Sequence, residues 1–161
     1  MVKSAAAHQP EALGSLYEID EPTWLAGQAE ALREGRMADV DHVNLAEFLD
    51  EMAARDRREL RNRFVVLLHH MLKWHYQPER RCRSWLVTIL REQDEVSGFL
   101  GAESMNQYVP MLYSSAWPPA VHRAMVETGL SATAFPRENP WDVKALVYMI
   151  VVPSNYPELP P

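Results

Sequence analysis

One apolar stripe constrains the fold of this chain more than any other feature. Large apolar side chains recur every three or four residues, at Leu60, Phe64, Leu67, Leu68, Met71 and Leu72. That spacing places all six on one face of an α-helix. Pro78 predicts where the helix ends, because the residue before a proline avoids helical geometry. We therefore expect a helix over about residues 56–76.

A second helix should follow after only a few residues. Ser84 is a residue type that can cap a helix at its start. The apolar side of this helix consists of Trp85, Ile89, Val96, Phe99 and Leu100. The pattern predicts a helix over about 84–100, and the short connection favours an antiparallel helical hairpin.

Weaker patterns predict shorter helices on either side of the hairpin. Asp20 before Glu21-Pro22 indicates a helix start, and Gly35 suits its left-handed end. Another helix is predicted by the spacing of Val40, Leu45, Phe48, Leu49 and Met52. We expect Pro118 and Pro119 to kink or break a later helix. Asn139-Pro140-Trp141-Asp142 is expected to form a turn that leads into a short last helix through about Ile150.

No run of alternating residues is long enough for a sheet, so the fold class predicted is all-α. We expect an irregular bundle of five to six helices, built round the hairpin of residues 56–76 and 84–100. The small polar residues 1–15 read as a flexible tail, and residues 16–161 as a single helical domain. No apolar run approaches the ~18 residues of a membrane span. Because Cys82 is the only cysteine, the simplest prediction is a cytoplasmic protein without a disulfide.

Charge is distributed unevenly along the chain. The formal net charge is −6, yet residues 55–91 hold ten basic residues against three acidic ones, a local charge of +7. Such a segment can attract an anionic partner, nucleic acid included. It can also be compensated inside the protein or across a dimer, which is the interpretation we favour because the rest of the chain is acidic.

The sequence HHMLKWHYQPERRCRSW at residues 69–85 contains the residues best suited to chemistry. His70, Lys73, Trp74 and Gln77 share one face of a helix. The candidate residues for binding an anion are Lys73, Trp74, Gln77, Arg81, Ser84 and Trp85. Arg81 offers a bidentate guanidinium and Lys73 a point charge.

This block supports two interpretations. As a catalytic site it would use His70 as acid or base and Lys73 with a shifted pKa, with Glu47 or Asp50 to orient them. As a structural network it would satisfy the polar groups of the hairpin turn, with Glu47 and Asp50 as ion-pair partners of Lys73 and the arginines. We favour the structural network.

Neither a metal nor a cofactor is predicted. The histidines at 69, 70 and 75 are not separated by three or four residues, so they do not form a helical metal pair. A zinc site would need Glu47, Asp50 or His42 from another helix. Cys82 lies among arginines that would lower its pKa, but no base is placed beside it, so we do not expect a nucleophile.

The same block resembles the signature of domain-of-unknown-function family 29, HLLKW followed by QP and RSxSW. The matching residues are His70, Lys73, Trp74, Gln77, Pro78, Arg81, Ser84 and Trp85. Further matches are Asp20 and Trp24, Leu32-Arg33, Arg91-Glu92-Gln93, Glu127–Leu130, Phe135-Pro136 and Pro140-Trp141. Cys82 stands where the family often has serine, and Phe48 where a second carboxylate is common. The resemblance spans about Leu16 to Val152 and implies a bacterial helical protein, without supplying an activity.

Three functions stay open at this point. The first is a non-enzymatic cytosolic interaction or regulatory module, with a protein partner or a second copy of the chain. The second is an enzyme or binding protein for a small phosphate or carboxylate compound, using His70, Lys73 and Arg81. The third is a nucleic-acid-associated protein of the toxin–antitoxin or stress type, using the basic segment 55–91.

Overall fold

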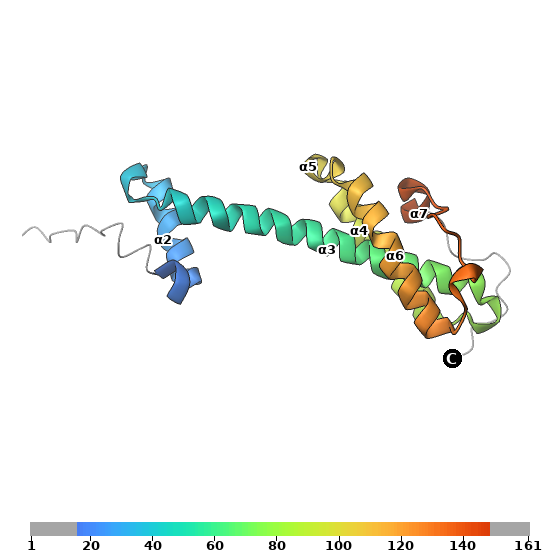
Figure 1. Cartoon of the computed structure of the whole chain (residues 1–161). Helices are drawn as coiled ribbons and strands as arrows, with labels where there is room; N and C mark the ends of the chain where they lie inside the picture. Colours follow the sequence, from blue (N-terminus) through green and yellow to red (C-terminus); the bar gives the residue numbers. More distant parts are fainter. Residues whose placement is uncertain (1–15, 149–161) are drawn as a thin grey trace, which may run out of the picture. The chain divides into compact units, whose positions relative to one another are not determined.

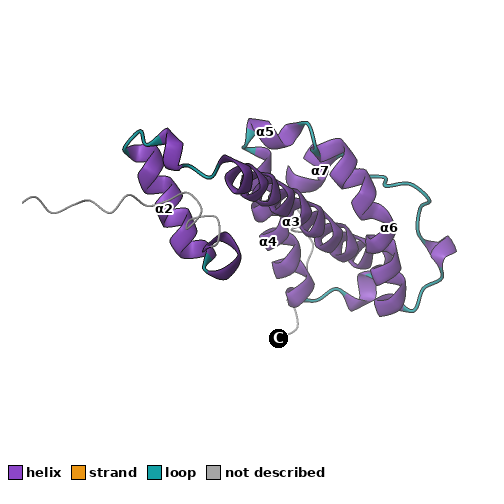
Figure 2. Ribbon diagram, turned by 60° about the vertical axis from the view of Figure 1, so that its left-hand side comes forward, coloured by secondary structure: helices purple, strands orange, loops and turns teal. Residues whose placement is uncertain are grey.

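The computed structural model describes residues 16–148, which contain helices and loops and no strand (Figures 1 and 2). The predicted all-α class is therefore confirmed. The helices are α2 (Glu21–Arg33), α3 (His42–Tyr76), α4 (Arg83–Leu100), α5 (Glu103–Asn106), α6 (Val109–Thr128) and α7 (Val143–Tyr148). Short 3₁₀ helices stand between them, at η1 (Met37–Asp39), η2 (Pro78–Arg80) and η3 (Ala132–Ala134).

The chain divides into two compact units, the first ending at Arg55 and the second beginning at Asp56. Helix α3 contributes residues to both. A single domain over 16–161 stays a prediction. The expected tail at 1–15 and the expected helix end at Ile150 lie outside the described residues.

Unit 1 contains α2, η1 and the first part of α3. Asp20 caps α2 as predicted, because its carboxylate accepts a hydrogen bond from the Thr23 N–H at 3.3 Å. The indole of Trp24 is fully buried and packs edge-on against Phe48, with ring centroids 5.9 Å apart. Gln28 is also buried, and its Oε1 accepts a hydrogen bond from the Asp41 N–H at 2.8 Å. This bond ties α2 to the start of α3.

The predicted boundary between a helix near 40–52 and a helix over 56–76 is wrong. A single helix, α3, runs for 35 residues from His42 to Tyr76. It contains no glycine or proline and is rich in alanine, leucine, glutamate and arginine, which favour continuous helix. Leu49 and Met52 were expected on a buried face, but their exposed fractions are 56% and 37%.

Unit 2 is built round the second part of α3. The six apolar residues of the stripe between Leu60 and Leu72 are at most 4% exposed, as predicted. They belong to one apolar core with residues of α4, α6 and α7, and these helices surround α3 in Figure 2. Burying each large side chain stabilises the unit by roughly 1.5–3 kcal/mol.

Helix α4 begins at Arg83, and its N-cap residue is Cys82 rather than Ser84. The predicted cap is therefore wrong: Ser84 lies in the first turn, where its hydroxyl is 3.1 Å from the Cys82 sulfur. The antiparallel hairpin stays a prediction. Two pairs between α3 and α4 are of the kind that such a hairpin makes, since Lys73 lies over Trp85 and Arg63 contacts Glu92.

We expected a kink or a break at Pro118 and Pro119. Helix α6 continues through both prolines, so the break is wrong and the kink stays a prediction. Pro119 has no N–H to donate to the Ser115 carbonyl four residues earlier. Arg61 of α3 takes over this role, because its Nη2 donates to the Ser115 carbonyl at 3.0 Å and its Nε to the Ser115 hydroxyl at 3.1 Å. A freed carbonyl that finds another donor allows the helix to continue. Gly129, in left-handed conformation with φ of 73°, ends α6.

Candidate functional site

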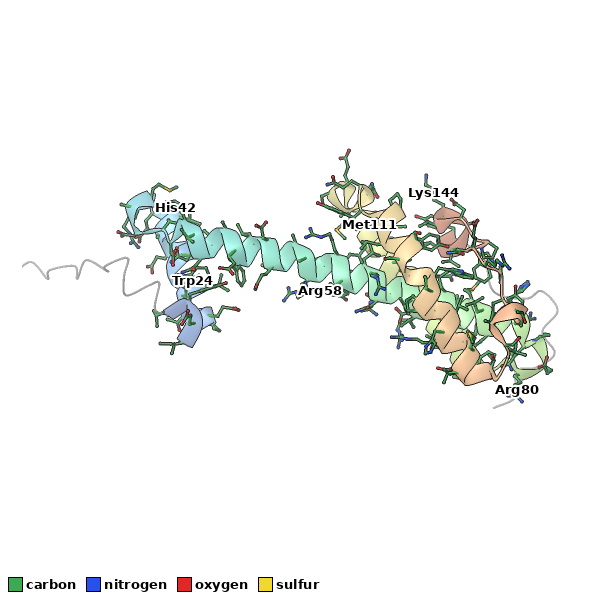
Figure 3. The ribbon with its side chains drawn as sticks, viewed as in Figure 1. Trp24, His42, Arg58, Arg80, Met111 and Lys144 are labelled. Carbon is green, nitrogen blue, oxygen red and sulfur yellow. The ribbon has the colours of Figure 1, made fainter. Side chains whose placement is uncertain are left out.

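The polar block of residues 69–85 lies where α3 ends, η2 turns and α4 begins, in unit 2. Figure 3 marks this end of the unit with the label of Arg80 on η2. The last turn of α6 lies against it, through Glu127 and Thr128. The site is therefore assembled from three helices.

Lys73 is the most firmly held cation of the block. Its Nζ lies 2.6 Å from the Oε2 of Glu127, and its side chain is 7% exposed. The same ammonium lies 4.3 Å from the centre of the Trp85 ring, a cation–π contact. The ion-pair partner expected at Glu47 or Asp50 is thus wrong. An external anion at Lys73 would have to displace the Glu127 carboxylate.

His69 is a member of the site that the sequence reasoning missed. Its Nε2 lies 3.3 Å from the Oε2 of Glu127, yet the geometry is not that of a hydrogen bond and the buried nitrogen has no such partner among the described residues. Burial lowers the pKa of His69 to about 4, and the Glu127 carboxylate opposes this only in part. The ring is therefore neutral at pH 7, and its contact with Glu127 is not an ion pair.

His70 has a fixed tautomer. Its Nδ1 lies 2.9 Å from the Val66 carbonyl, so Nδ1 carries the proton and donates while Nε2 keeps its lone pair. Burial lowers the pKa of His70 as well. The neutral ring contacts His69 edge-on at 4.7 Å. Such an imidazole can accept a proton, which is the chemistry predicted for this position.

Gln77 and Arg81 satisfy the carbonyl groups at the ends of two helices. The Gln77 amide donates to the carbonyl of Thr128, the last residue of α6, at 3.2 Å. The Arg81 Nε donates to the carbonyl of Trp74 in the last turn of α3 at 2.8 Å. Its guanidinium also lies 5.2 Å from the Trp74 ring centre. Both residues therefore supply donors that helix ends lack.

Cys82 and Ser84 stand at the start of α4. Burial acts to raise the pKa of the Cys82 thiol, but hydrogen bonds from the Ser84 hydroxyl and from the Trp85 and Ser84 N–H groups lower it overall. The physical cause is therefore the hydrogen bonding at the helix start rather than the neighbouring arginines. No base accompanies the thiol in the contacts described.

The predicted carboxylates and this block belong to different units. Glu47 and Asp50 are exposed residues of unit 1. On α3 they precede His70 by 23 and 20 residues, more than five helical turns. Among residues 16–148, no group of three or more His, Cys, Asp or Glu side chains could hold a metal ion.

A different candidate surface lies on the first part of α3, in unit 1. Its members recur at spacings of one, four, seven and eight residues, and we call them the α3 stripe: Leu45, Ala46, Leu49, Met52 and Ala53. This spacing covers one face of the helix about 120° wide. All but the half-buried Leu45 are exposed. None of the chain's five tryptophans contributes to such a surface, because all five are buried or half-buried.

The surroundings of the α3 stripe are acidic. Described residues 16–55 contain ten acidic and three basic side chains, a net charge of −7. Arg36, one of the three, is engaged by Glu34 and Asp39. Glu47, Asp50 and Glu51 on α3 itself are exposed. Unit 1 thus presents an apolar helix face within a negatively charged surface.

The family comparison covers most of the chain. The family model with the description "Domain of unknown function DUF29" matches residues 16–149. The chain belongs to the DUF29 family. The resemblance inferred from its motifs is confirmed, and the description of DUF29 assigns no activity. Comparisons with curated proteins and with solved structures found no match.

Two further observations on the DUF29 chain concern its helices and Glu127. Within residues 16–148, no helix has both the length and the apolar character to span a membrane. Glu127, the acid at the centre of the site, belongs to the ETGL segment that contributed to the DUF29 resemblance. That resemblance was the only signal in the sequence that could have pointed to this residue.

Proposed function

We propose that this DUF29 chain is a non-enzymatic interaction module, and that its α3 stripe binds an amphipathic helix of a partner protein. The observation that carries the proposal is the exposure of Leu49 and Met52 at helical spacing on one face of α3. A cytoplasmic location is part of the proposal and is supported by the single cysteine.

Exposed apolar side chains are concentrated in unit 1. Six of the eleven exposed large hydrophobic side chains belong to it, although it holds fewer than a third of the described residues. Scattered apolar residues are ordinary on a protein surface, but a contiguous helical stripe marks an interaction site. Burying Leu49 or Met52 against a partner would contribute roughly 1.5–3 kcal/mol each before the costs of association.

Two buried donors add to this picture of unit 1. The Trp24 indole Nε1 and the Gln28 Nε2 have no hydrogen-bond partner among the described residues. Buried hydrogen-bond donors in folded proteins are rarely left without an acceptor. A unit with unpaired donors inside and apolar residues outside is consistent with packing that is completed by a partner.

The charge of unit 1 specifies the partner's chemistry. A net charge of −7 over residues 16–55 favours a helix whose apolar face is flanked by lysine or arginine. An acidic helix would be repelled by Glu47, Asp50 and Glu51. Helix-on-helix recognition of this kind uses apolar anchors at spacings of three and four residues.

The polar block supports a non-enzymatic role. Lys73 is paired with Glu127, Gln77 with Thr128, and Arg81 with the Trp74 carbonyl. Each of the predicted anion-binding groups named here thus has an internal partner. Binding of an external anion at these groups would require these contacts to be broken first.

The test is titration of the full chain with a fluorescent leucine–lysine peptide designed as an amphipathic helix. Two peptides serve as comparisons, one of the same composition in scrambled order and one with glutamate in place of lysine. We expect binding of the first alone, weakening as salt is raised because surface charges are screened. Equal binding of the scrambled peptide would contradict the proposal.

Substitutions locate the surface. Leu49→Gln and Met52→Gln remove apolar area without adding charge, and each should weaken peptide binding about tenfold. Val43→Gln is the matched control, because Val43 is 78% exposed on the same helix but lies outside the α3 stripe. An equal loss from Val43→Gln would show that the peptide does not bind the α3 stripe.

A further inference from the structure

Unit 2 contains an open groove that none of the roles above uses. It runs along α6 and the segment after it, with a volume of about 360 Å³. Its walls include Trp117, Val121 and Met125 of α6. Phe135, the residue that follows η3, also lines it. Volumes of this size are typical of small-molecule sites.

The aromatic residues Trp117 and Phe135 of the groove are fixed by contacts with neighbouring residues. The Trp117 indole Nε1 donates to the Arg137 carbonyl at 3.3 Å, and its ring meets that of Trp141 at 6.1 Å. The Phe135 ring packs edge-on against Tyr76 of α3 at 5.1 Å. The groove is therefore formed before any ligand arrives, which lowers the ordering cost of binding.

The polar groups of the groove are few and carry one sign. Two exposed residues with a basic side chain, Arg137 and His122, are part of its lining, and no acidic residue lines it. No ion pair is formed by Arg137 within the described part of the chain. A guanidinium is always charged at physiological pH, and it binds a carboxylate through two parallel hydrogen bonds.

We propose that this groove binds a small apolar carboxylate, with the alkyl or aryl body between Trp117 and Phe135 and the carboxylate on Arg137. A monoanion is favoured over a phosphate because one arginine balances one negative charge. The imidazole of His122 supplies a further polar group at the rim. The site lies in unit 2 and is independent of the interaction proposed for unit 1.

The experiment uses three probes that share one alkyl chain and differ in the head group. Octanoate, octanol and octylammonium are titrated into the full chain, and binding is followed by calorimetry and by the melting temperature. We expect octanoate to bind on the order of tenfold more tightly than octanol, and octylammonium to bind weakest. Equal affinities for octanoate and octanol, or binding by none of the three, would overturn the proposal.

Variants separate the two parts of the site. Arg137→Gln should reduce octanoate affinity to that of octanol and leave octanol unchanged, whereas Val121→Gln should weaken both. Arg123→Gln is the matched control, since Arg123 is an exposed arginine of α6 that does not line the groove. Each variant's own melting temperature without probe shows that it is folded. Unchanged octanoate affinity in Arg137→Gln would remove the assigned role of this arginine.

Discussion

Lys73 of α3 and Glu127 of α6 lie 54 residues apart in the chain and form an ion pair of 2.6 Å. The pair is asymmetric, because the Lys73 side chain is 7% exposed and that of Glu127 is 48% exposed. It joins the ends of two helices that Gln77 and Thr128 also connect. Residues of the polar block thus connect the end of α3 to the end of α6.

The asymmetry of this pair predicts unequal costs for removing its two members. Glu127→Gln leaves a buried ammonium without a counter-charge, and we expect a loss of about 2–4 kcal/mol in the free energy of unfolding. Lys73→Met replaces the buried partner with an apolar side chain and leaves a carboxylate that water can reach, so a loss of about 1 kcal/mol is expected. Urea unfolding of the two variants measures the difference, and the opposite order would contradict it.

Stability should fall as the pH is lowered. The pKa of His69 is about 4 in the folded chain, below the ordinary value of 6.5, so the unfolded state binds more protons between these values. The contribution of His69 to the free energy of unfolding is therefore fully present above about pH 6.5. It is lost progressively as the pH falls towards 4, by up to about 3 kcal/mol. The lowered pKa values of His70 and Glu127 act in the same direction.

Urea unfolding at a series of pH values tests this dependence. His69→Gln should flatten the loss of stability between pH 6.5 and 4, because the titrating group is gone. If the slope of His69→Gln equals that of the wild type, another group is responsible.

We predict that Arg61 of α3 stabilises the proline-containing part of α6. Removing it in Arg61→Ala leaves the Ser115 carbonyl without its donor, at a cost of about 1 kcal/mol. In a Pro119→Ala background the backbone N–H at position 119 can bond to that carbonyl again, so Arg61→Ala should then cost less. A double-mutant cycle by thermal unfolding measures the coupling. An absence of coupling would mean that Arg61 does not compensate for Pro119.

The buried stripe between Leu60 and Leu72 could be predicted from the sequence, because the spacing of large apolar residues is a local property. The continuity of α3 could not be predicted as easily. The apolar spacing was fitted to two separate helices, one reaching Met52 and the other starting near residue 56. Helix propensity between residues 42 and 76 outweighs this division, since no glycine or proline breaks the run.

The membership of the polar block was predicted, but its partners were not. His70 and Lys73 stand on neighbouring turns of α3, so their grouping follows from helix geometry. Gln77 and Arg81 follow directly in the chain, at the two ends of η2. Glu127 contacts Lys73 because the tertiary fold places the end of α6 beside α3. Local sequence patterns do not reveal that placement. The bridging of Pro119 by Arg61 has the same origin, since a donor 54 residues from Ser115 leaves no local pattern.

Hydrogen exchange of the full chain, with and without the leucine–lysine peptide, tests the interaction proposed for the α3 stripe. We predict added protection of amides in residues 43–55, where the α3 stripe lies, and unchanged exchange in 69–85. The same experiment on Leu49→Gln should show the protection reduced. Protection confined to 69–85, with none in 43–55, would show that the peptide does not bind the α3 stripe.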